Sequence, residues 1–463
     1  MVTSPSSTPE DSVTIPLSPP KTVRITAKNV RQAFVPQSKQ QRYLQVEAAL
    51  AEAEGVIGMI PMEAAVRISE TARSITLDQD KLAARVAAQG HTMMALVEEL
   101  AEAVGDEHGG WVHWGATTQN IQQTGDILIL RDVHNALVEY VDQALVAAAD
   151  LIDRTAATPM AGRTHWQHAV PITFGLKVAA WSDQLLRHRE RLDEIKPRLL
   201  RSMTGGAAGT FASFGPQGIE LQAEVARRLG LLPMDVPSRA VVDHLTEFVL
   251  LLGLISATVQ SVGQEIQLLN TPELGEAHES VPPGQVGSST MPQKRLAPNV
   301  GITVMSAAHA RSAVPLALEA MLQSHEVDGT RSVFLDRALE QACIGTVEAM
   351  EALVDLLRGL QIDEERMRVN LALTNGLINS EAVMLHLAET LGRQEAHHVV
   401  HHAVELVNTE AVSFADALLS DERVSSHMTA ADILRITDPA HYTGLSEEIA
   451  RASAARARSV VGG

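Results

Sequence analysis

Three long stretches of this chain have the spacing of apolar residues that is typical of helices, and each runs for about 30 residues. They are 127–158, 172–200 and 241–270. A helix of that length spans about 45 Å. Rods of this kind bury their apolar faces best against one another, so the sequence predicts a bundle of long helices.

The composition also favours helices over sheets. Aromatic residues make up 3% of the chain and apolar residues 45%, most of them Ala, Leu and Val. Aliphatic side chains of this kind suit packed helices better than a sandwich or barrel. No stretch has the pattern of a β-hairpin, so the expected fold class is all-α. The 463 residues suffice for about three domains.

The chain is acidic, with 56 Asp and Glu against 37 Lys and Arg and a net charge of −19. Binding to nucleic acid needs clustered Lys and Arg, so we expect no nucleic-acid partner, while a local basic pocket for a small anion stays possible. Cys343 is the only cysteine, which excludes an intrachain disulfide and suits the reducing cytoplasm. The most apolar stretch, 248–262, is shorter than the about 20 residues that span a bilayer, so we expect a core helix and no membrane.

Short segments without helical spacing lie between the rods, and they are rich in Gly, Ser, Thr, His and Pro. They are 109–124, 159–173, 204–218 and 282–299. Loops on a rigid scaffold are where catalytic and binding groups are usually placed. The first 20 residues are rich in Ser, Thr and Pro and contain no Lys or Arg, which is typical of a disordered tail rather than a secretory signal.

The most specific of these segments reads GQVGSSTMPQKR, from Gly284 to Arg295. Ser288 and Ser289 offer two adjacent hydroxyls beside a permissive glycine, and Lys294 adds a cation. Loop amides and Lys294 could together hold an anion. An ordinary polar Ser/Gly loop is the alternative.

A second segment, GRTHWQHAVPITFG, carries His165 next to Arg163 and Thr164. A histidine beside a hydroxyl and a guanidinium is suited to proton transfer, although a lone histidine is more often structural. A third segment, HWGATTQNIQQTGD, places Thr117 and Thr118 near a helix start. Short hydrogen-bonding side chains there either bind a carboxylate or cap the helix, and both readings stay open.

In this order and at these separations, the three segments resemble the fumarase/aspartase superfamily of lyases. GSSTMPQKR resembles its signature loop, usually GSSxMPxKxN, and the other two resemble its histidine segment and its Thr-Ser segment. The opening QRYLQVEAALAEAEGVIGMIP and the later IDEERMRVNLALTNGLINSEAVMLHLAETLGRQEAHHVVHHA resemble it too. The likeness covers 34–403 and is greatest to the branch of 3-carboxy-cis,cis-muconate cycloisomerase and adenylosuccinate lyase.

That resemblance implies a three-domain, all-α fold whose central helices form a twenty-helix core in a homotetramer. Each active site then combines segments from three subunits, and no metal or other cofactor takes part. On this chain the implied parts are a disordered tail, an N-terminal helical domain, a central long-helix bundle with the catalytic loops, and a C-terminal helical domain. Their expected bounds are 1–22, 23–110, 111–361 and 362–463.

The resemblance also implies anti β-elimination across a C–N or C–O bond of a substituted succinate, releasing fumarate or a related acid. A base removes the proton next to a carboxylate, fixed donors stabilise the aci-carboxylate, and an acid protonates the leaving group. By position in the motifs, Ser288 on a mobile loop is the base and His165 the acid-side histidine. The expected substrate-binding residues are His91, His113, Thr117, Thr118, Gln119, Arg163, Thr164, Gln167, Ser289, Met291, Lys294 and Arg331.

Several positions depart from the superfamily's usual pattern. Leu296 stands where an Asn is usual, Gly301 lies near the place of an acidic residue that orients the histidine, and Asn120 replaces an Asp. Val327 replaces an arginine, for which Arg331 is the expected substitute. These changes predict an unusual substrate or altered chemistry, and a small di- or tricarboxylate rather than a nucleotide.

Three functions stay open at this point. They are elimination from a substituted succinate, lactonisation of the 3-carboxy-cis,cis-muconate type, and a non-catalytic protein that keeps the lyase fold. Two pairs of histidines at helical spacing could bind a metal, but no carboxylate lies between them, so no metal site is expected. These histidines are His397, His398, His401 and His402.

Overall fold

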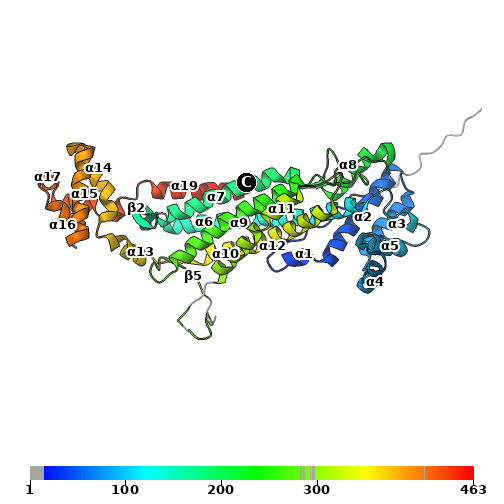
Figure 1. Ribbon diagram of the computed structural model, residues 1–463, viewed down its shortest axis with the longest axis horizontal. Coiled ribbons are helices and arrows are strands. Elements are labelled where there is room, and N and C mark those ends of the chain that lie inside the picture. The colour runs from blue at the N-terminus through cyan, green and yellow to red at the C-terminus, as the bar shows by residue number, and fades with distance from the viewer. Residues whose placement is uncertain are drawn as a thin grey trace, which may run out of the picture. The chain divides into compact units, whose positions relative to one another are not determined.

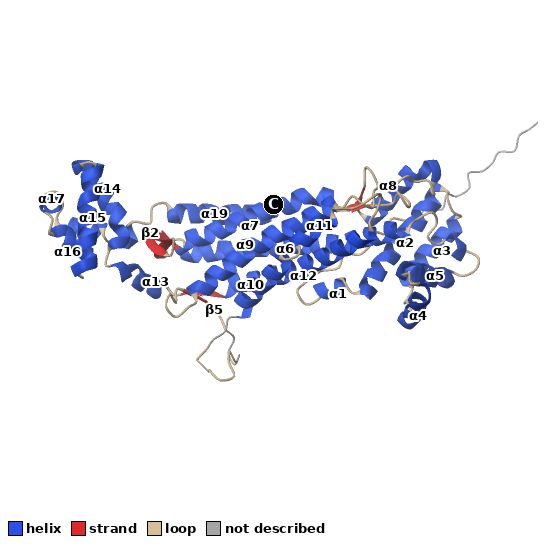
Figure 2. Cartoon of the chain, viewed as in Figure 1, coloured by secondary structure: helices blue, strands red, loops and turns tan. Residues whose placement is uncertain are grey.

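The computed structural model of the protein describes residues 15–281, 284, 287–291, 293–294, 298–410 and 412–462. Over these residues the chain is mostly helical, and its strands form three two-stranded pairs (Figures 1 and 2). The predicted all-α class is confirmed. Most of the expected tail, residues 1–14, lies outside the described part.

Each of the three long stretches that were predicted to be helical forms a single continuous helix. They are α6 (Thr118–Thr155), α7 (Phe174–Leu199) and α9 (Asp243–Leu269), and α12 (Gly329–Gly359) is a further one of 31 residues. α6 starts earlier than its apolar pattern indicated, because its first turns bury polar side chains. The most apolar 18-residue window of α9 passes a length and composition test for a membrane span, but 67% of it is buried, as expected of a core helix.

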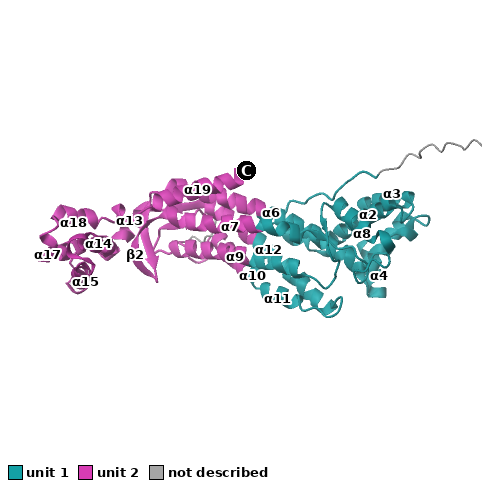
Figure 3. Ribbon diagram, turned by 90° about the horizontal axis from the view of Figure 1, so that it is seen from above, with its two compact units in different colours: residues 1–137, 192–253, 309–347 teal, residues 138–191, 254–308, 348–463 magenta. Residues whose placement is uncertain are grey.

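The chain forms two compact units, each built from three stretches of sequence (Figure 3). Unit 1 comprises 1–137, 192–253 and 309–347, and unit 2 comprises 138–191, 254–308 and 348–463. The long helices each contribute one part to each unit. The three predicted domains are consecutive segments of the chain, unlike these two units, and their boundaries stay a prediction.

Unit 1 gathers shorter helices around α2 (Pro36–Ile57), which packs against α3 (Met62–Ser74) and α8 (Gly218–Leu229). Glu52 of α2 is fully buried and forms ion pairs with Arg228 at 2.7 Å and with Arg73 at 2.6 Å, which ties the three helices together. α2 ends at Ile57 and is capped by Gly58, whose left-handed φ of 80° favours glycine. The shorter helices and strands of this unit, in which η denotes a 3-10 helix, are α1 (Val30–Ala33), α2 (Pro36–Ile57), α3 (Met62–Ser74), α4 (Gln79–Gln89), α5 (Thr92–Val104), η1 (Gly109–Trp111), β3 (Arg201–Ser202), η2 (Gly215–Gln217), α8 (Gly218–Leu229), β4 (Leu232–Pro233) and α11 (Val314–Ala320).

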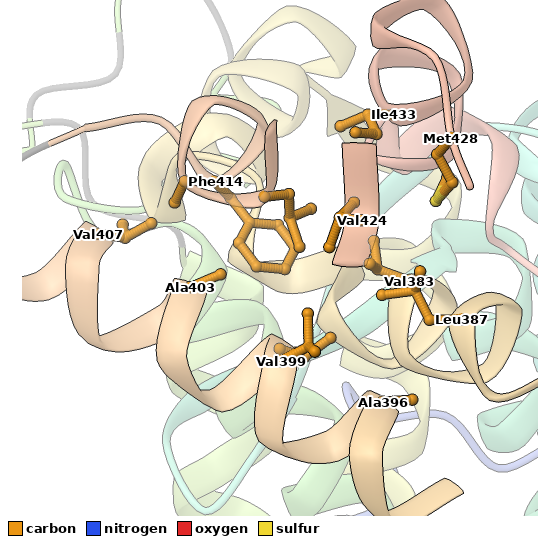
Figure 4. Close-up of a cluster of buried hydrophobic side chains, with 13 residues drawn as sticks. Val383, Leu387, Ala396, Val399, Ala403, Val407, Phe414, Val424, Met428 and Ile433 are labelled. Atoms are coloured by element: carbon orange, nitrogen blue, oxygen red, sulfur yellow. The ribbon is translucent and has the colours of Figure 1, made fainter. Parts of the chain in front are cut away.

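Unit 2 ends in a small helical cluster with its own apolar core (Figure 4). Phe414 is fully buried there among aliphatic side chains of α14 (Ser380–Leu391), α15 (Arg393–Glu410) and α18 (Ala430–Ile436). The remaining elements of this unit are β1 (Pro159–Thr164), β2 (Gln167–Thr173), β5 (Ala277–Glu279), α10 (Pro298–Arg311), β6 (Leu360–Ile362), α13 (Glu364–Leu371), η3 (Ala372–Thr374), η4 (Leu377–Asn379), α14 (Ser380–Leu391), α15 (Arg393–Glu410), α16 (Phe414–Leu419), α17 (Glu422–Ser425), α18 (Ala430–Ile436), η5 (Pro439–His441) and α19 (Ser446–Gly462).

One expectation about the fold was wrong: the segment 159–173 is a β-hairpin. β1 and β2 pair antiparallel, with Pro159 opposite Thr173 and Thr164 opposite Gln167. This hairpin could not be recognised in the sequence, because its turn lacks the Asn-Gly or Asp-Gly pair that marks most two-residue hairpins. β3 pairs parallel with β4, and β5 antiparallel with β6.

Candidate active site

The hairpin presents His165 at its tip. Thr164 and Gln167 close a turn whose two central residues, His165 and Trp166, have φ values of 50° and 66°. Positive φ at both positions matches the twist of a hairpin but strains residues with a side chain. Both side chains are exposed, and that of Trp166 is 86% accessible. His165, the expected acid, is therefore exposed to solvent at the tip of a rigid hairpin.

Arg163, an expected substrate ligand, has a partner within the protein. Its guanidinium donates two hydrogen bonds, at 2.6 and 2.8 Å, to the carboxylate of Glu276. Glu276 is completely buried and also accepts a bond of 2.7 Å from Asn370 on α13. This arrangement ties the hairpin to α13, so the structure assigns Arg163 a bracing role that its sequence position did not indicate.

His165 and Arg163 also line a cavity of about 500 Å³ in unit 2. His168, opposite Arg163 in the hairpin, lines it too, and its Nδ1 is buried with no hydrogen-bond partner among the described residues. Burial and then the charge of Arg163 lower the pKa of His168, which favours the neutral form of its ring. The described residues of the serine loop do not line this cavity.

The serine loop holds the Ser288 hydroxyl within a tight turn. Its Oγ accepts backbone N–H bonds from Met291 at 3.1 Å and Thr290 at 3.4 Å. Amides that point at this oxygen favour its anionic form. Ser289, Met291 and Lys294 are exposed, and the chain turns again where the Lys294 N–H bonds the Met291 carbonyl at 3.0 Å.

The far end of the loop is anchored by a residue that the sequence analysis missed. Glu279 is buried, and its carboxylate accepts bonds of 3.1 Å from the N–H groups of Asn299 and Val300 at the start of α10. A carboxylate there satisfies free amides and the helix dipole. Gly301 leaves open space in this helix, and Leu296 lies outside the described residues.

The start of α6 explains one departure from the family pattern. The Asn120 side chain is buried, accepts bonds from the N–H groups of Thr117 at 3.1 Å and Gly206 at 3.2 Å, and donates one to the Gly206 carbonyl at 3.4 Å. An amide can accept and donate at once, whereas an ionised aspartate only accepts. Asn120 therefore connects the Thr117 segment to the 203–206 segment and leaves Thr118 and Gln119 half-buried beside it.

His113, also of unit 1, is paired with a buried carboxylate. Its Nδ1 lies 2.6 Å from Glu47 Oε1, and its φ of 62° is strained for a histidine. Burial disfavours the imidazolium, but the charge and hydrogen bond of Glu47 outweigh it and raise the pKa of His113. Glu54 lies near Glu47, and burial followed by the Glu47 charge raises the pKa of Glu54 well above its usual value. The sequence does not mark either carboxylate as functional, because both lie within an ordinary helical pattern.

Two further expected ligands have local structural roles. His91 caps α5, because its Nδ1 accepts the Met94 N–H at 3.2 Å. Arg331 pairs with Glu319 at 3.0 Å, and its guanidinium lies 5.8 Å from the Phe334 ring centre. Neither contact excludes a substrate, because the side chains of His91, Arg331 and Glu319 are exposed or half-buried.

Polar residues that the sequence analysis did not single out lie beside Gln119. They line a cavity of about 30 Å³, where the Nε2 of Gln123 and the Nε of Arg239 are buried with no partner among the described residues. Asp126 lines it as well, and burial raises its pKa to about 6 although Lys39 lies 3.2 Å away. The signal available was the spacing of 119, 123 and 126, which places them on one face of α6.

The expected site residues therefore fall into two groups. Unit 1 carries His91, His113, Thr117, Thr118, Gln119 and Arg331. Unit 2 carries Arg163, Thr164, His165, Gln167, Ser288, Ser289, Met291 and Lys294. Among the residues that the structure describes, no group of three or more His, Cys, Asp or Glu could hold a metal ion.

Comparisons with known proteins agree with this fold and these motifs. Residues 20–309 match the family described as Lyase, and residues 376–452 match the adenylosuccinate lyase C-terminus. The chain therefore belongs to the fumarase/aspartase superfamily of lyases and cycloisomerases. Within that superfamily it lies in the branch of 3-carboxy-cis,cis-muconate cycloisomerase and adenylosuccinate lyase, as the sequence predicted.

Relatives in this branch match nearly the whole chain. It is 37% identical to a 3-carboxy-cis,cis-muconate cycloisomerase of Pseudomonas aeruginosa over 425 residues, which are 90% of this chain and 92% of that one. It is 38% identical to an N-acetyl-S-(2-succino)cysteine lyase of Enterococcus italicus over 405 residues, 87% of this chain and 89% of that one. The crystal structure of a 3-carboxy-cis,cis-muconate lactonizing enzyme from Pseudomonas putida matches with a TM-score of 0.88 at 32% identity, covering 94% of this chain and 98% of that one.

Proposed function

We propose that this enzyme is a cofactor-free lyase that catalyses anti β-elimination from a substituted succinate, with Ser288 as the base. The observation that carries the proposal is the pair of backbone N–H groups that point at Ser288 Oγ. A serine hydroxyl is a weak base in water, so it needs donors of this kind before it can remove a proton from carbon.

The other steps are assigned by the same chemistry. His165, at the hairpin tip, protonates the departing nitrogen or oxygen, because an unprotonated amine or alkoxide leaves poorly. Thr117, Thr118 and Gln119 at the start of α6 bind a substrate carboxylate, where the free N–H groups of a helix favour negative charge. Lys294 lies close to the charge that develops on the aci-carboxylate.

We further propose that the enzyme works as a cytoplasmic homotetramer with shared active sites. Each unit leaves large apolar side chains exposed on α9 and on or next to the shorter helices α10 and α11, and such surfaces are usually covered by another chain. In unit 1 these are Leu250, Leu318, Met321 and Leu322, and in unit 2 they are Leu254, Ile302 and Met305. Size measurement by light scattering tests this, and a monomer at working concentration would contradict it.

Replacing Ser288 by alanine tests the base directly. A panel of succinates carrying nitro, guanidino, amino and alkoxy leaving groups is followed by the ultraviolet absorbance of fumarate, with Ser426→Ala, an exposed serine of the C-terminal cluster, as control. S288A is expected to abolish turnover and keep the oligomer, while S426A keeps both. An S288A enzyme with an unchanged rate would refute the assignment.

Lactonisation of a 3-carboxy-cis,cis-muconate-type acid is the second candidate. It is favoured by the matches to the cycloisomerase and the lactonizing enzyme, each of which covers at least 90% of this chain. Including 3-carboxy-cis,cis-muconate in the panel separates the two reactions. Its conversion to a lactone, with no fumarate from any succinate, would replace elimination as the reaction of this enzyme.

A further inference from the structure

Unit 1 contains a cavity of about 360 Å³ beside the N-terminal segment 18–21. Its other walls come from α2, α3 and α8, the three helices that Glu52 ties together. None of its lining residues is among those proposed for catalysis or for substrate binding. A molecule bound in this cavity is therefore a separate ligand and not the substrate.

The charged residues that line this cavity are all cations. They are Lys21, Arg73 and Arg228, and no Asp or Glu lines the cavity among the residues that the structure describes. The whole chain carries a net charge of −19, so a wall of this sign differs from the protein as a whole. A cleft lined by one sign of charge concentrates ligands of the opposite sign, which here are anions.

The arginines of the cavity are only partly neutralised within the protein. Arg73 and Arg228 share one buried carboxylate, that of Glu52, at 2.6 and 2.7 Å. Arg228 also pairs with Glu224 at 2.8 Å, but Glu224 pairs with Arg227 as well, at 2.6 Å. Two carboxylates are therefore shared among three guanidinium groups.

Lys21 adds a cation that has no ion-pair partner among the described residues. Its backbone carbonyl accepts a bond from Arg42 at 3.3 Å, and the Ser18 carbonyl accepts one from Arg73 at 3.4 Å. These bonds hold the segment against the helices and keep the exposed Lys21 at the cavity. With Lys21 counted, four cations face two carboxylates, which leaves two positive charges unmatched.

The rest of the lining suits an organic group that carries the anion. Gln45 Oε1 accepts a bond from Arg42 at 3.1 Å, so its NH2 group, which has no partner among the described residues, can donate to a ligand. Pro19, Ala72 and Leu229 offer apolar contact. A free phosphate ion would leave much of the cavity to water, at about 30 Å³ for each water molecule, whereas its volume lies within the range of pockets that bind whole small molecules.

We propose that this cavity binds a small phosphate monoester, as a ligand site separate from the proposed catalytic residues. A phosphate monoester carries nearly two negative charges at pH 7, which matches the two unmatched positive charges around the cavity. Its oxygens accept charge-assisted hydrogen bonds from Lys21 and Arg73, and its organic body lies against the apolar lining. The inference does not depend on the proposed elimination, because no lining residue takes part in that reaction.

Calorimetric titration of the full chain with glycerol 3-phosphate tests the site. The wild type is expected to bind this ester saturably and not to bind glycerol, which lacks the phosphate. Lys21→Gln removes one charge and should weaken binding about 3- to 10-fold, because a charge-assisted hydrogen bond is weakened where water reaches it. Lys28→Gln is the control and should keep the wild-type affinity, since Lys28 is an exposed lysine of the same segment that does not line the cavity.

A second variant adds a negative charge to the lining. Gln45→Glu keeps an oxygen for the bond from Arg42 but places a carboxylate beside the phosphate, so it should weaken binding more than Lys21→Gln does. Glycerol 3-phosphate should also raise the Tm of the wild type more than that of either variant, because a ligand that binds the folded state stabilises it.

Four results would overturn the proposal. The first is no saturable binding of glycerol 3-phosphate by the wild type at millimolar concentration. The second is wild-type affinity in both Lys21→Gln and Gln45→Glu, and the third is an equal loss in Lys21→Gln and Lys28→Gln, which would indicate unspecific attraction. The fourth is inorganic phosphate binding as tightly as the ester, which would make the cavity a site for the free ion only.

Discussion

Removing the carboxylate of Glu276 is the perturbation whose effect the structure predicts most directly. This side chain is completely buried, and it accepts two hydrogen bonds from Arg163 and one from Asn370. Breaking a buried ion pair costs about 3–5 kcal/mol, because the remaining charge stays buried without a partner. The Arg163 side chain keeps 20% of its surface in water, so we expect the lower end, about 3 kcal/mol for Glu276→Ala.

A double-mutant cycle isolates the energy of the pair. Glu276→Ala, Arg163→Met and the double variant are compared by urea unfolding, together with hydrogen exchange of the hairpin amides in 159–173. The double variant should be more stable than Glu276→Ala alone, because it carries no orphaned guanidinium. Glu247→Ala is the control, since its bidentate bond to Arg198 is largely exposed and should matter much less.

Three results would contradict the bracing role of the Arg163–Glu276 pair. A free energy of unfolding for Glu276→Ala within about 0.5 kcal/mol of the wild type would show that the pair does not brace the hairpin. Strict additivity in the cycle would show the same. Unchanged hydrogen exchange in 159–173 would place the effect, if any, elsewhere in unit 2.

Three other residues give sharp expectations. Burial, then the charges of Arg191 and Arg187, lower the pKa of His188 to about 4. The neutral imidazole therefore stabilises the fold above about pH 6.5, and up to about 3 kcal/mol of unfolding free energy is lost as the pH falls toward 4. His188→Gln should flatten this part of a plot of unfolding free energy against pH, and an equally steep fall in the variant would contradict the assignment. Phe414→Ala leaves a cavity in the C-terminal cluster and should cost about 3–5 kcal/mol, seen as faster hydrogen exchange in α14 to α18 and not in unit 1. Glu47→Gln removes the charge beside His113, so the pKa of that imidazole should fall in an NMR titration, and an unmoved pKa would mean that Glu47 does not set it.

The helical part of the fold could be predicted from the sequence because its cause is local. Apolar side chains at helical spacing over about 30 residues allow few structures other than a packed rod, and α7 and α9 start and end within two residues of the predicted positions. The hairpin at 159–173 could not be predicted in this way. Its turn is formed by His165 and Trp166, whose left-handed backbone is imposed by the surrounding contacts and not by their own preference.

The candidate site shows the same division. The residue types of the serine loop, the histidine segment and the Thr-Ser segment, and their order, could be read from the sequence because each motif is contiguous. Their partners could not, because they lie far away along the chain: Glu276 is 113 residues from Arg163, and Glu47 is 66 residues from His113.

What the sequence by itself determined is the helical bundle, its family and the residue types of its loops. The tertiary structure alone decided which charges are neutralised, which donors point at Ser288 Oγ, and that the indole beside His165 stays in water. The physical reason is that periodicity acts over a few residues, whereas burial and charge pairing depend on which distant segments the packed core brings together.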